Sequence, residues 1–292
     1  MMQFSTLSLG LWRLASWNYS SQQVLDLVKH SLDVGITTFD HADIYGSYTC
    51  EEIFGNALAG QSSLRNRMQL VSKCGIKLVS DQRPLHTMKS YDTGREHIMR
   101  SVENSLQTLR TDYLDVLLIH RPSPLMDADE IGEAFGTLKQ QGKVLHFGVS
   151  NFSTSQFDLL QSRFDFPLVT NQIEISVLCP APFTNGLLDH CQQHRYQPMA
   201  WSPVGGGRLF DHENQQTHQL RETLTGIAQS LGNYSIEQVA LAWLLGHPAR
   251  IIPVLGTGKT ERLSSATQAL DISLTTEQWL EIFMAATGME LP

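Results

Sequence analysis

Short apolar runs alternate with longer runs of helical period along the sequence, and this alternation limits the fold more than any other feature. Most of the short runs are apolar throughout, which is typical of parallel strands that helices cover. Eight such units in 292 residues correspond to the size of a (β/α)8 barrel, the TIM-barrel architecture. The expected strands are residues 7–10, 35–40, 68–73, 113–120, 146–151, 168–172, 198–202 and 251–255.

The helices between these strands are indicated by their apolar faces and by their first residues. One helix is expected just before the strand at 113–120, because apolar residues share one of its faces: Ile98, Val102, Leu106 and Leu109. Four other helices are expected to start at a capping box, in which Ser or Thr and a Gln three residues later satisfy each other's backbone amides. These pairs are Ser20/Gln23, Ser153/Gln156, Ser235/Gln238 and Thr275/Gln278.

An open, doubly wound sheet is the alternative fold for the same alternation. The first expected strand is not followed by G-x-G-x-x-G, the glycine pattern of dinucleotide-binding sheets, and this favours the barrel. No composition shift or low-complexity tract marks a linker, so we expect a single barrel domain over residues 1–292. Two polar stretches, 76–93 and 205–217, follow expected strands and would overhang the C-terminal mouth of the barrel.

Composition excludes several classes of partner. Lys and Arg number 21 against 29 Asp and Glu, which gives a net charge of −8 without any basic run. Nucleic-acid binding through phosphate neutralisation is therefore not expected. No apolar stretch approaches the roughly 18–20 residues that span a bilayer, so we expect no membrane contact.

The cysteines and the N-terminus indicate a cytoplasmic protein. The chain has no C-x-x-C pair, and no Cys/His cluster with metal-ligand spacing was identified. The first residues lack the basic and apolar segments of a secretory signal. We therefore expect reduced thiols, a cytoplasmic location and no bound metal. The four cysteines are Cys50, Cys74, Cys179 and Cys191.

Polar side chains stand at the ends of the first internal strands. Asp40, Lys73 and His120 occupy strand ends, and Tyr45 lies just beyond Asp40. Each alone has an ordinary structural explanation, as a helix cap, a solvated charge or a packed ring. A barrel, however, brings the C-terminal ends of its strands together at one mouth, where polar residues are typically catalytic.

As a group, these four residues favour proton transfer to an oxygen atom. An ammonium about 4 Å from a phenol favours the phenolate by roughly 4 kcal/mol at an effective dielectric of 20. We therefore expect Lys73 to lower the pKa of Tyr45 by about two units or more, with Asp40 holding the lysine. A neutral His120 could donate a hydrogen bond to a carbonyl oxygen. None of these groups donates a hydride, so a reduction needs a cofactor.

The stretch TFDHADIYG at residues 38–46 resembles the signature of the aldo-keto reductase family. VSK at 71–73 resembles that family's lysine strand, and DYLDVLLIHRP at 112–122 resembles its histidine strand. The resemblance runs in order from about residue 7 to residue 270 and points to bacterial oxidoreductases of the YdhF type. Further blocks resemble the family's cofactor-binding segments: GVSNF (148–152), NQIE (171–174), WSPVG (201–205) and GTGKTER (256–262).

The resemblance implies an NADPH-dependent reductase that converts a small aldehyde or ketone into an alcohol. Tyr45 would be the proton donor, Lys73 and Asp40 its tuning pair, and His120 the residue that orients the carbonyl group. NADP(H) would lie extended across the mouth without a Rossmann fold. The resemblance does not single out one carbonyl compound or an oligomeric state.

The resemblance also implies a set of cofactor contacts. Ser150, Asn151 and Gln172 would hold the nicotinamide carboxamide, and Trp201 would stack on the ring, where the family more often has Tyr. Asp40 would belong to this set as well. The remaining expected contacts lie beside the ribose (Gly10, Leu11, Trp12), around the pyrophosphate (Ser202, Pro203, Val204, Gly205, Gly206) and at the adenosine end (Gly256, Thr257, Gly258, Lys259, Arg262).

Two departures from the family pattern concern the adenosine end. Gly256 stands where many relatives have a lysine, and Ser265-Ala266 replaces an acidic or amide residue followed by Asn. Arg262 is retained, and Lys259 supplies a nearby cation. We therefore expect a preference for NADPH over NADH, through an altered grip on the 2′-phosphate.

Two other functions remain as alternatives. A non-catalytic or slow NADPH-binding regulator could use the same barrel, as the potassium-channel β subunits of this family do. Asp40-His41-Ala42-Asp43 could also suggest a metal-dependent barrel hydrolase, although the His-x-His pattern usual in such enzymes is absent from the first strands. Candidate residues for an aromatic substrate pocket are Trp12, Trp17, Tyr48 and Met88.

Overall fold

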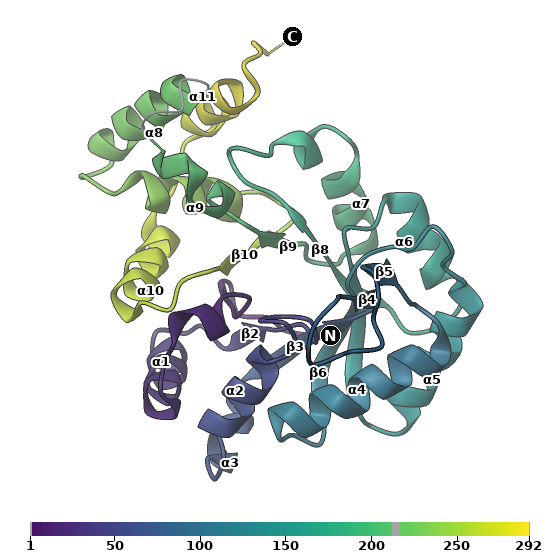
Figure 1. The fold of residues 1–292 in the computed structure, drawn as a ribbon. Helices are drawn as coiled ribbons and strands as arrows, with labels where there is room; N and C mark the ends of the chain where they lie inside the picture. The colour runs from purple at the N-terminus through teal and green to yellow at the C-terminus, as the bar shows by residue number, and fades with distance from the viewer. Residues whose placement is uncertain (1, 212–216, 292) are drawn as a thin grey trace.

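The computed structural model describes residues 2–211 and 217–291, which form a barrel of parallel strands surrounded by helices (Figure 1). The barrel strands are β1 (Ser8–Gly10), β2 (Thr38–Asp40), β3 (Gln69–Cys74), β6 (Leu114–Ile119), β7 (Val144–Ser150), β8 (Leu168–Glu174), β9 (Met199–Trp201) and β10 (Ile252–Leu255). Neighbours follow chain order around the barrel, and β1 pairs with both β2 and β10, which closes it. The predicted (β/α)8 barrel and all eight predicted strands are thereby confirmed.

Helices form the outer layer. The α-helices are α1 (Ser21–Asp33), α2 (Cys50–Ala57), α3 (Ser62–Arg65), α4 (Arg95–Leu109), α5 (Ala128–Gln140), α6 (Thr154–Gln161), α7 (Leu187–His194), α8 (His218–Ser230), α9 (Ile236–Leu245), α10 (Thr260–Thr267) and α11 (Thr276–Thr287). Short 3-10 helices are η1 (Leu14–Trp17), η2 (Ala181–Phe183), η3 (Gly205–Phe210) and η5 (Gln268–Asp271). The four predicted capping boxes are all present, at the starts of α1, α6, α9 and α11. The predicted apolar face of α4 is buried.

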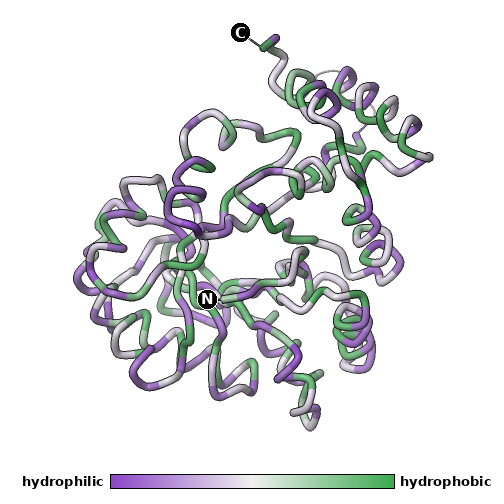
Figure 2. The backbone as a smooth tube through the Cα atoms, turned by 180° about the vertical axis from the view of Figure 1, so that it is seen from behind, coloured by the Kyte–Doolittle hydropathy of each residue, from purple (hydrophilic) through white to green (hydrophobic). Residues whose placement is uncertain are grey.

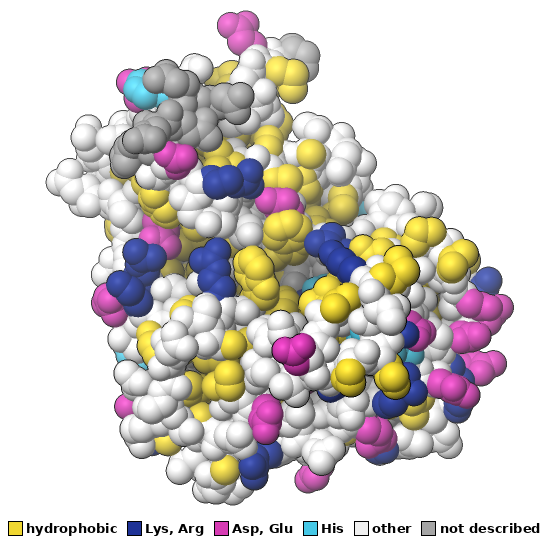
Figure 3. Space-filling view, in the orientation of Figure 1, with side chains coloured by type: hydrophobic (Ala, Val, Ile, Leu, Met, Phe, Trp, Pro, Cys, Tyr) yellow, Lys and Arg dark blue, Asp and Glu magenta, His cyan; other side chains and the backbone are white. Residues whose placement is uncertain are grey.

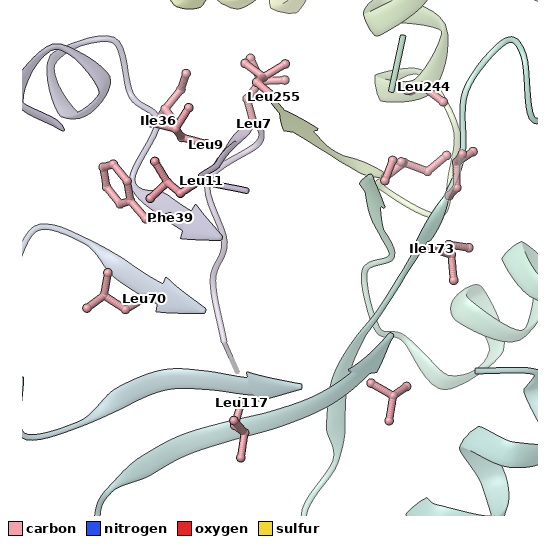
Figure 4. Packing of buried hydrophobic residues seen from close by; sticks show 14 of the residues in the cluster. Leu7, Leu9, Leu11, Ile36, Phe39, Leu70, Leu117, Ile173, Leu244 and Leu255 are labelled. Carbon is pink, nitrogen blue, oxygen red and sulfur yellow. The ribbon is translucent and has the colours of Figure 1, made fainter. Parts of the chain in front are cut away.

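Successive strand residues face opposite sides of the barrel wall, which produces two apolar layers. Outward-facing residues pack against the helices, and Figure 4 shows Leu9, Phe39, Leu70 and Leu117 in this layer. Figure 2 shows apolar and polar stretches alternating along the surrounding helices. The interior of the barrel is filled by a separate cluster: Phe4, Val71, Val116, Leu118, Met199, Ile252 and Val254.

The same alternation places the polar residues at the mouth. Lys73 lies two residues after the interior Val71, and His120 lies two residues after the interior Leu118. Both side chains therefore project toward the barrel axis, one layer above the apolar filling. The interior thus changes from apolar to polar at the C-terminal ends of the strands.

The two predicted polar stretches follow β3 and β9. The first contains a short antiparallel pair, β4 (Ile76–Lys77) with β5 (Ser90–Tyr91), which the sequence pattern did not indicate. The second begins with η3, and its residues 212–216 lie outside the described part of the chain. Among the described residues, no helix is long and apolar enough to cross a membrane.

Gly148 on β7 tests how tightly the barrel wall is packed. A Cβ atom at this position would lie 2.7 Å from the Thr170 carbonyl oxygen and 2.8 Å from Cδ2 of Leu118. We expect Gly148→Ala to lower the free energy of unfolding by about 1–3 kcal/mol, because the added methyl overpacks the wall. Urea unfolding followed by circular dichroism measures the change.

Gly136→Ala is the matched control. Gly136 lies in α5, and a Cβ atom there would meet nothing within 4 Å. Because alanine favours helix, this substitution should raise the free energy of unfolding by roughly 0.5–1 kcal/mol. Equal effects of the two substitutions would contradict the packing argument.

Candidate active site

The ammonium of Lys73 is the centre of the candidate site. Its Nζ lies 2.8 Å from both carboxylate oxygens of Asp40 and donates to the His41 carbonyl oxygen at 2.7 Å. It also donates to the Tyr45 hydroxyl at 3.0 Å. The Lys73 side chain is completely buried, so its ammonium is shielded from water. Asp40 and Tyr45, expected from the sequence to form one site with Lys73, both contact its ammonium.

The local backbone explains why these groups meet. Asp40 is the last residue of β2 and pairs in register with Val71 of β3, two residues before Lys73. The chain then turns back, with the Tyr45 amide donating to the Ala42 carbonyl oxygen at 3.1 Å. This turn returns the phenol to the mouth, above the end of β3.

His120 completes the predicted set of four. Its amide continues the ladder beyond β6 by donating to the Cys74 carbonyl oxygen, and its ring meets the Tyr45 ring edge-on, with centroids 5.8 Å apart. Burial, aided by the positive charges of Lys73 and Arg121, holds the pKa of His120 well below its usual range. The imidazole is therefore neutral at neutral pH, as expected, and can act as a hydrogen-bond donor.

The expected direction of the Tyr45 pKa shift is wrong for this structure. Burial of the phenol raises the pKa of Tyr45 and outweighs the lowering by Lys73. Asp40 adds to the rise, because its negative charge opposes formation of the phenolate. Tyr45 is therefore a neutral phenol at neutral pH and carries a proton that it can donate.

Lys73 stays charged despite its burial. Desolvation favours the neutral amine, but the contacts with Asp40 and Tyr45 are stronger together, and the pKa of Lys73 is raised. Burial alone would lower the pKa of a lysine by several units. The carboxylate therefore keeps the ammonium charged, as the sequence analysis expected.

Four predicted nicotinamide contacts lie together beside this cluster. Gln172 Nε2 donates to Oδ1 of Asp40 at 2.8 Å, and Ser150 Oγ donates to the Gln172 carbonyl oxygen at 2.9 Å. Asn151 links Ser150 to Trp201: its Nδ2 donates to Ser150 Oγ at 2.7 Å, and its Oδ1 accepts from Trp201 Nε1 at 3.1 Å. Polar amides and one half-buried aromatic ring thus share this part of the mouth.

The three consecutive residues expected beside the ribose, Gly10, Leu11 and Trp12, lie in different environments. Gly10 ends β1 against Val254 and Leu255 of β10. The Leu11 side chain is fully buried in the outer apolar layer, so a side-chain contact from Leu11 to a cofactor is not supported. The reason is strand alternation, because the residue after an inward-facing Gly10 faces the helices. Trp12 follows with 61% of its surface exposed.

The segment after β9 contains three glycines in the left-handed region, Gly205, Gly206 and Gly207, with φ of 63°, 67° and 99°. The residue before this turn, Ser202, accepts a hydrogen bond from the Gly205 amide at 2.8 Å. A backbone with this conformation favours glycine and leaves little side-chain bulk over the loop. It therefore suits the close approach of a ligand, the role expected of residues 202–206.

The residues expected to contact the adenosine end of the cofactor, within 256–262, lie at the start of α10. The Tyr19 hydroxyl donates to the Gly258 carbonyl oxygen at 3.0 Å, and Gly258 packs on the Trp17 ring. One face of the half-buried Trp17 ring is therefore occupied by Gly258. Lys259 precedes α10, and Arg262 in its first turn is close enough to Glu237 to affect the pKa of that carboxyl.

His41 does not support the alternative of a metal-dependent hydrolase. Its ring is completely buried against Phe54 at a centroid distance of 4.5 Å, and burial lowers its pKa to about 3. Asp40 beside it already binds the lysine ammonium through both oxygens. The side chains of Asp40 and His41 therefore lie in different surroundings and do not face one shared site for a metal ion.

Sequence reasoning missed two contacts at the mouth. The Arg121 guanidinium lies 5.8 Å from the centroid of the Trp201 ring, and the Tyr48 hydroxyl accepts from the Leu78 amide at 2.8 Å. The position of Arg121 directly after His120 could have indicated the first contact. The second joins two loops after different strands, so no local pattern indicated it.

The comparisons with known proteins agree with this geometry. A model of the Aldo/keto reductase family matches residues 6–285. The chain is 50% identical to "Oxidoreductase YdhF" of Escherichia coli, over 99% of this chain and 96% of that protein. It is 44% identical to "6-dehydroglucose reductase" of Agrobacterium fabrum, over 99% of this chain and 97% of that one.

Among solved structures, the chain is similar to an aldo/keto reductase from Klebsiella pneumoniae in complex with NADP and acetate. The TM-score is 0.78 at 29% identity, over 96% of this chain and 90% of that chain. The fold, the ordered strand-end residues and the family match over nearly the whole length all agree. The chain belongs to the aldo-keto reductase family.

Proposed function

We propose that this protein is an NADPH-dependent reductase that converts an aldehyde or ketone into an alcohol, with Tyr45 as the proton donor. The observation that carries the proposal is the contact between the Tyr45 hydroxyl and the buried Lys73 ammonium, beside the edge of the His120 ring. A neutral phenol and a neutral imidazole at one mouth can both donate hydrogen bonds to a carbonyl oxygen.

The residues present fit the chemistry of NADPH. Trp201 offers an aromatic face for a nicotinamide ring, and the nearby amides of Asn151 and Gln172 suit a carboxamide. The left-handed glycines after β9 leave room for a pyrophosphate close to the backbone. Figure 3 shows a hollow near the centre of the face that is turned toward the viewer, with hydrophobic and basic side chains around it.

Proton and electron transfer balance in the proposed reaction. NADPH, when bound, would provide the hydride equivalent that the reduction of a carbonyl carbon requires. Tyr45 gives its hydroxyl proton to the carbonyl oxygen, which becomes the alcohol oxygen. Lys73 stays beside the phenolate that remains, so its positive charge acts where negative charge develops. His120 orients the carbonyl group through a hydrogen bond.

A relative at 44% identity that bears the name "6-dehydroglucose reductase" supports a carbonyl compound as the substrate. A panel of candidate substrates for the activity assay should therefore contain 6-dehydroglucose as well as simple aldehydes and ketones. NADPH oxidation with any member of the panel distinguishes an enzyme from a non-catalytic NADPH-binding regulator. A chain that binds NADPH but turns over no carbonyl compound would support the regulator.

Tyr45→Phe tests the proton donor. We expect kcat for carbonyl reduction to fall by roughly 10²–10⁴-fold, the usual contribution of a general acid, while the Kd for NADPH stays nearly unchanged. The control is Tyr113→Phe, because the Tyr113 ring lies under Arg65 at the opposite end of the barrel. Wild-type turnover by the Tyr45 variant would exclude Tyr45 as the donor.

The pH profile tests the direction of the pKa shifts. Reduction needs a protonated Tyr45, and burial raises its pKa, so kcat/KM should stay level up to at least about pH 9, below the ordinary tyrosine pKa of ~10. His120 must be neutral and its pKa is lowered, so no loss should be centred near about pH 6.5. A decline of kcat/KM with a midpoint between these values would contradict the assignment.

Arg262→Ala tests cofactor choice. A guanidinium can bind a 2′-phosphate bidentately, and NADH has no such phosphate. We expect the variant to weaken NADPH binding far more than NADH binding, in the lower part of a roughly 10–150-fold range because Gly256 replaces a second cation. Fluorescence titrations with both cofactors measure this, with Arg67→Ala as a control. Equal losses for the two cofactors would show that Arg262 does not contact the phosphate.

A further inference from the structure

Three metal-ligating side chains meet on the outside of the barrel, away from the mouth. Asp158 lies on α6, and His190 and His194 lie on the neighbouring helix α7 (Figure 1). Their ligand atoms all lie within 4.8 Å of one another, the one group of this kind found in residues 2–211 and 217–291. Two histidines four positions apart share one helical face. The sequence analysis expected no metal ligands and overlooked this spacing.

The distances fit a single small ion. His190 Nε2 lies 2.9 Å from Asp158 Oδ1, and His194 Nε2 lies 3.6 Å from the same oxygen. Metal–ligand bonds of about 2.0–2.1 Å in a tetrahedron place neighbouring ligand atoms about 3.3 Å apart. The two measured separations lie on either side of this value, so an ion could enter with small side-chain movements.

The buried histidine is held in the orientation that a ligand needs. His190 is nearly fully buried, and its Nδ1 lies 2.9 Å from the Tyr196 hydroxyl. Nε2–H of the same ring donates to Oδ1 of Asp158 at 2.9 Å, since a carboxylate oxygen only accepts. A metal ion would replace this proton on Nε2, and Nδ1–H would then donate to the Tyr196 hydroxyl. A partner on the second ring nitrogen is typical of metal-binding histidines.

Aromatic packing fixes the rings further. Phe157 of α6 stacks on Tyr196 at a centroid distance of 4.4 Å and meets the His190 ring edge-on at 5.2 Å. The other two ligands remain open to solvent, with 39% of the His194 side chain and 53% of the Asp158 side chain exposed. An ion could therefore enter from solvent, and water could complete its coordination.

We propose that Asp158, His190 and His194 form a binding site for a divalent transition-metal ion of the Zn²⁺ type. Two imidazoles and one carboxylate suit Zn²⁺, Ni²⁺, Co²⁺ or Cu²⁺, whereas Mg²⁺ and Ca²⁺ prefer oxygen ligands. The bound ion joins α6 to α7. The chain before α6 contains Asn151, and the chain after α7 leads to Trp201, so the ion braces the two segments whose side chains hydrogen-bond at the mouth.

Zinc titration of the full-length protein tests this proposal. After treatment with EDTA and desalting, calorimetry with ZnCl₂ should show one site per chain in the wild type. His194→Ala removes an exposed ligand without touching the His190–Tyr196 pair, and we expect it to weaken binding at least tenfold. Tyr196→Phe keeps the stacked ring but removes the hydroxyl, and it should weaken binding by about 10–100-fold.

Two further measurements complete the test. Zn²⁺ should raise the Tm of the wild type more than that of His194→Ala at the same zinc concentration. His218→Ala is the control, since His218 forms an exposed pair with Glu222 on α8 and should not change zinc affinity. Equal zinc affinity of the wild type and His194→Ala would overturn the proposal. A wild type that binds no zinc would also overturn it, and would leave the three residues as a hydrogen-bonded contact between two helices.

Discussion

The buried ammonium of Lys73 is the constraint on which the candidate site depends. A charged group inside a protein is strongly unfavourable unless it is paired and fully hydrogen-bonded. Two carboxylate oxygens, one carbonyl oxygen and one hydroxyl meet that requirement here. Removing Asp40 would leave a buried charge without its counter-ion, so the end of β2, the turn to Tyr45 and the end of β3 can keep only one arrangement.

The same pairing explains the balance of charges at the mouth. Because the phenol is buried and Asp40 opposes a second negative charge, the ammonium does not ionise Tyr45 in the free protein, and the phenol keeps its proton. The ammonium becomes effective only when the proton leaves and the phenolate forms. Stabilisation that grows with the developing charge is the kind that accelerates a reaction. The rise in the Tyr45 pKa is therefore compatible with its proposed role.

The alternation of apolar strands with amphipathic helices made the fold predictable from the sequence. Lys73 and His120 could be assigned to the mouth because each stands at the end of an expected strand. The sign of the Tyr45 pKa shift could not be predicted, since it depends on burial by segments distant in sequence. The outward position of Leu11 follows from the alternation of side chains along β1, which the sequence pattern alone did not reveal. The contact of Asp158 with α7 depends on how two helices pack, although the spacing of the two histidines was already visible.

Closure of the barrel has a consequence for how the chain is made. β1 is completed only by β10, where Ser8 pairs with Val254. While the chain emerges from the ribosome, β1 has no partner on that side until nearly the whole protein has been synthesised. Its backbone N–H and C=O groups form an open edge during this interval, and such edges can pair with other chains. Late closure therefore leaves one edge of the first strand open for most of the time in which the chain is synthesised.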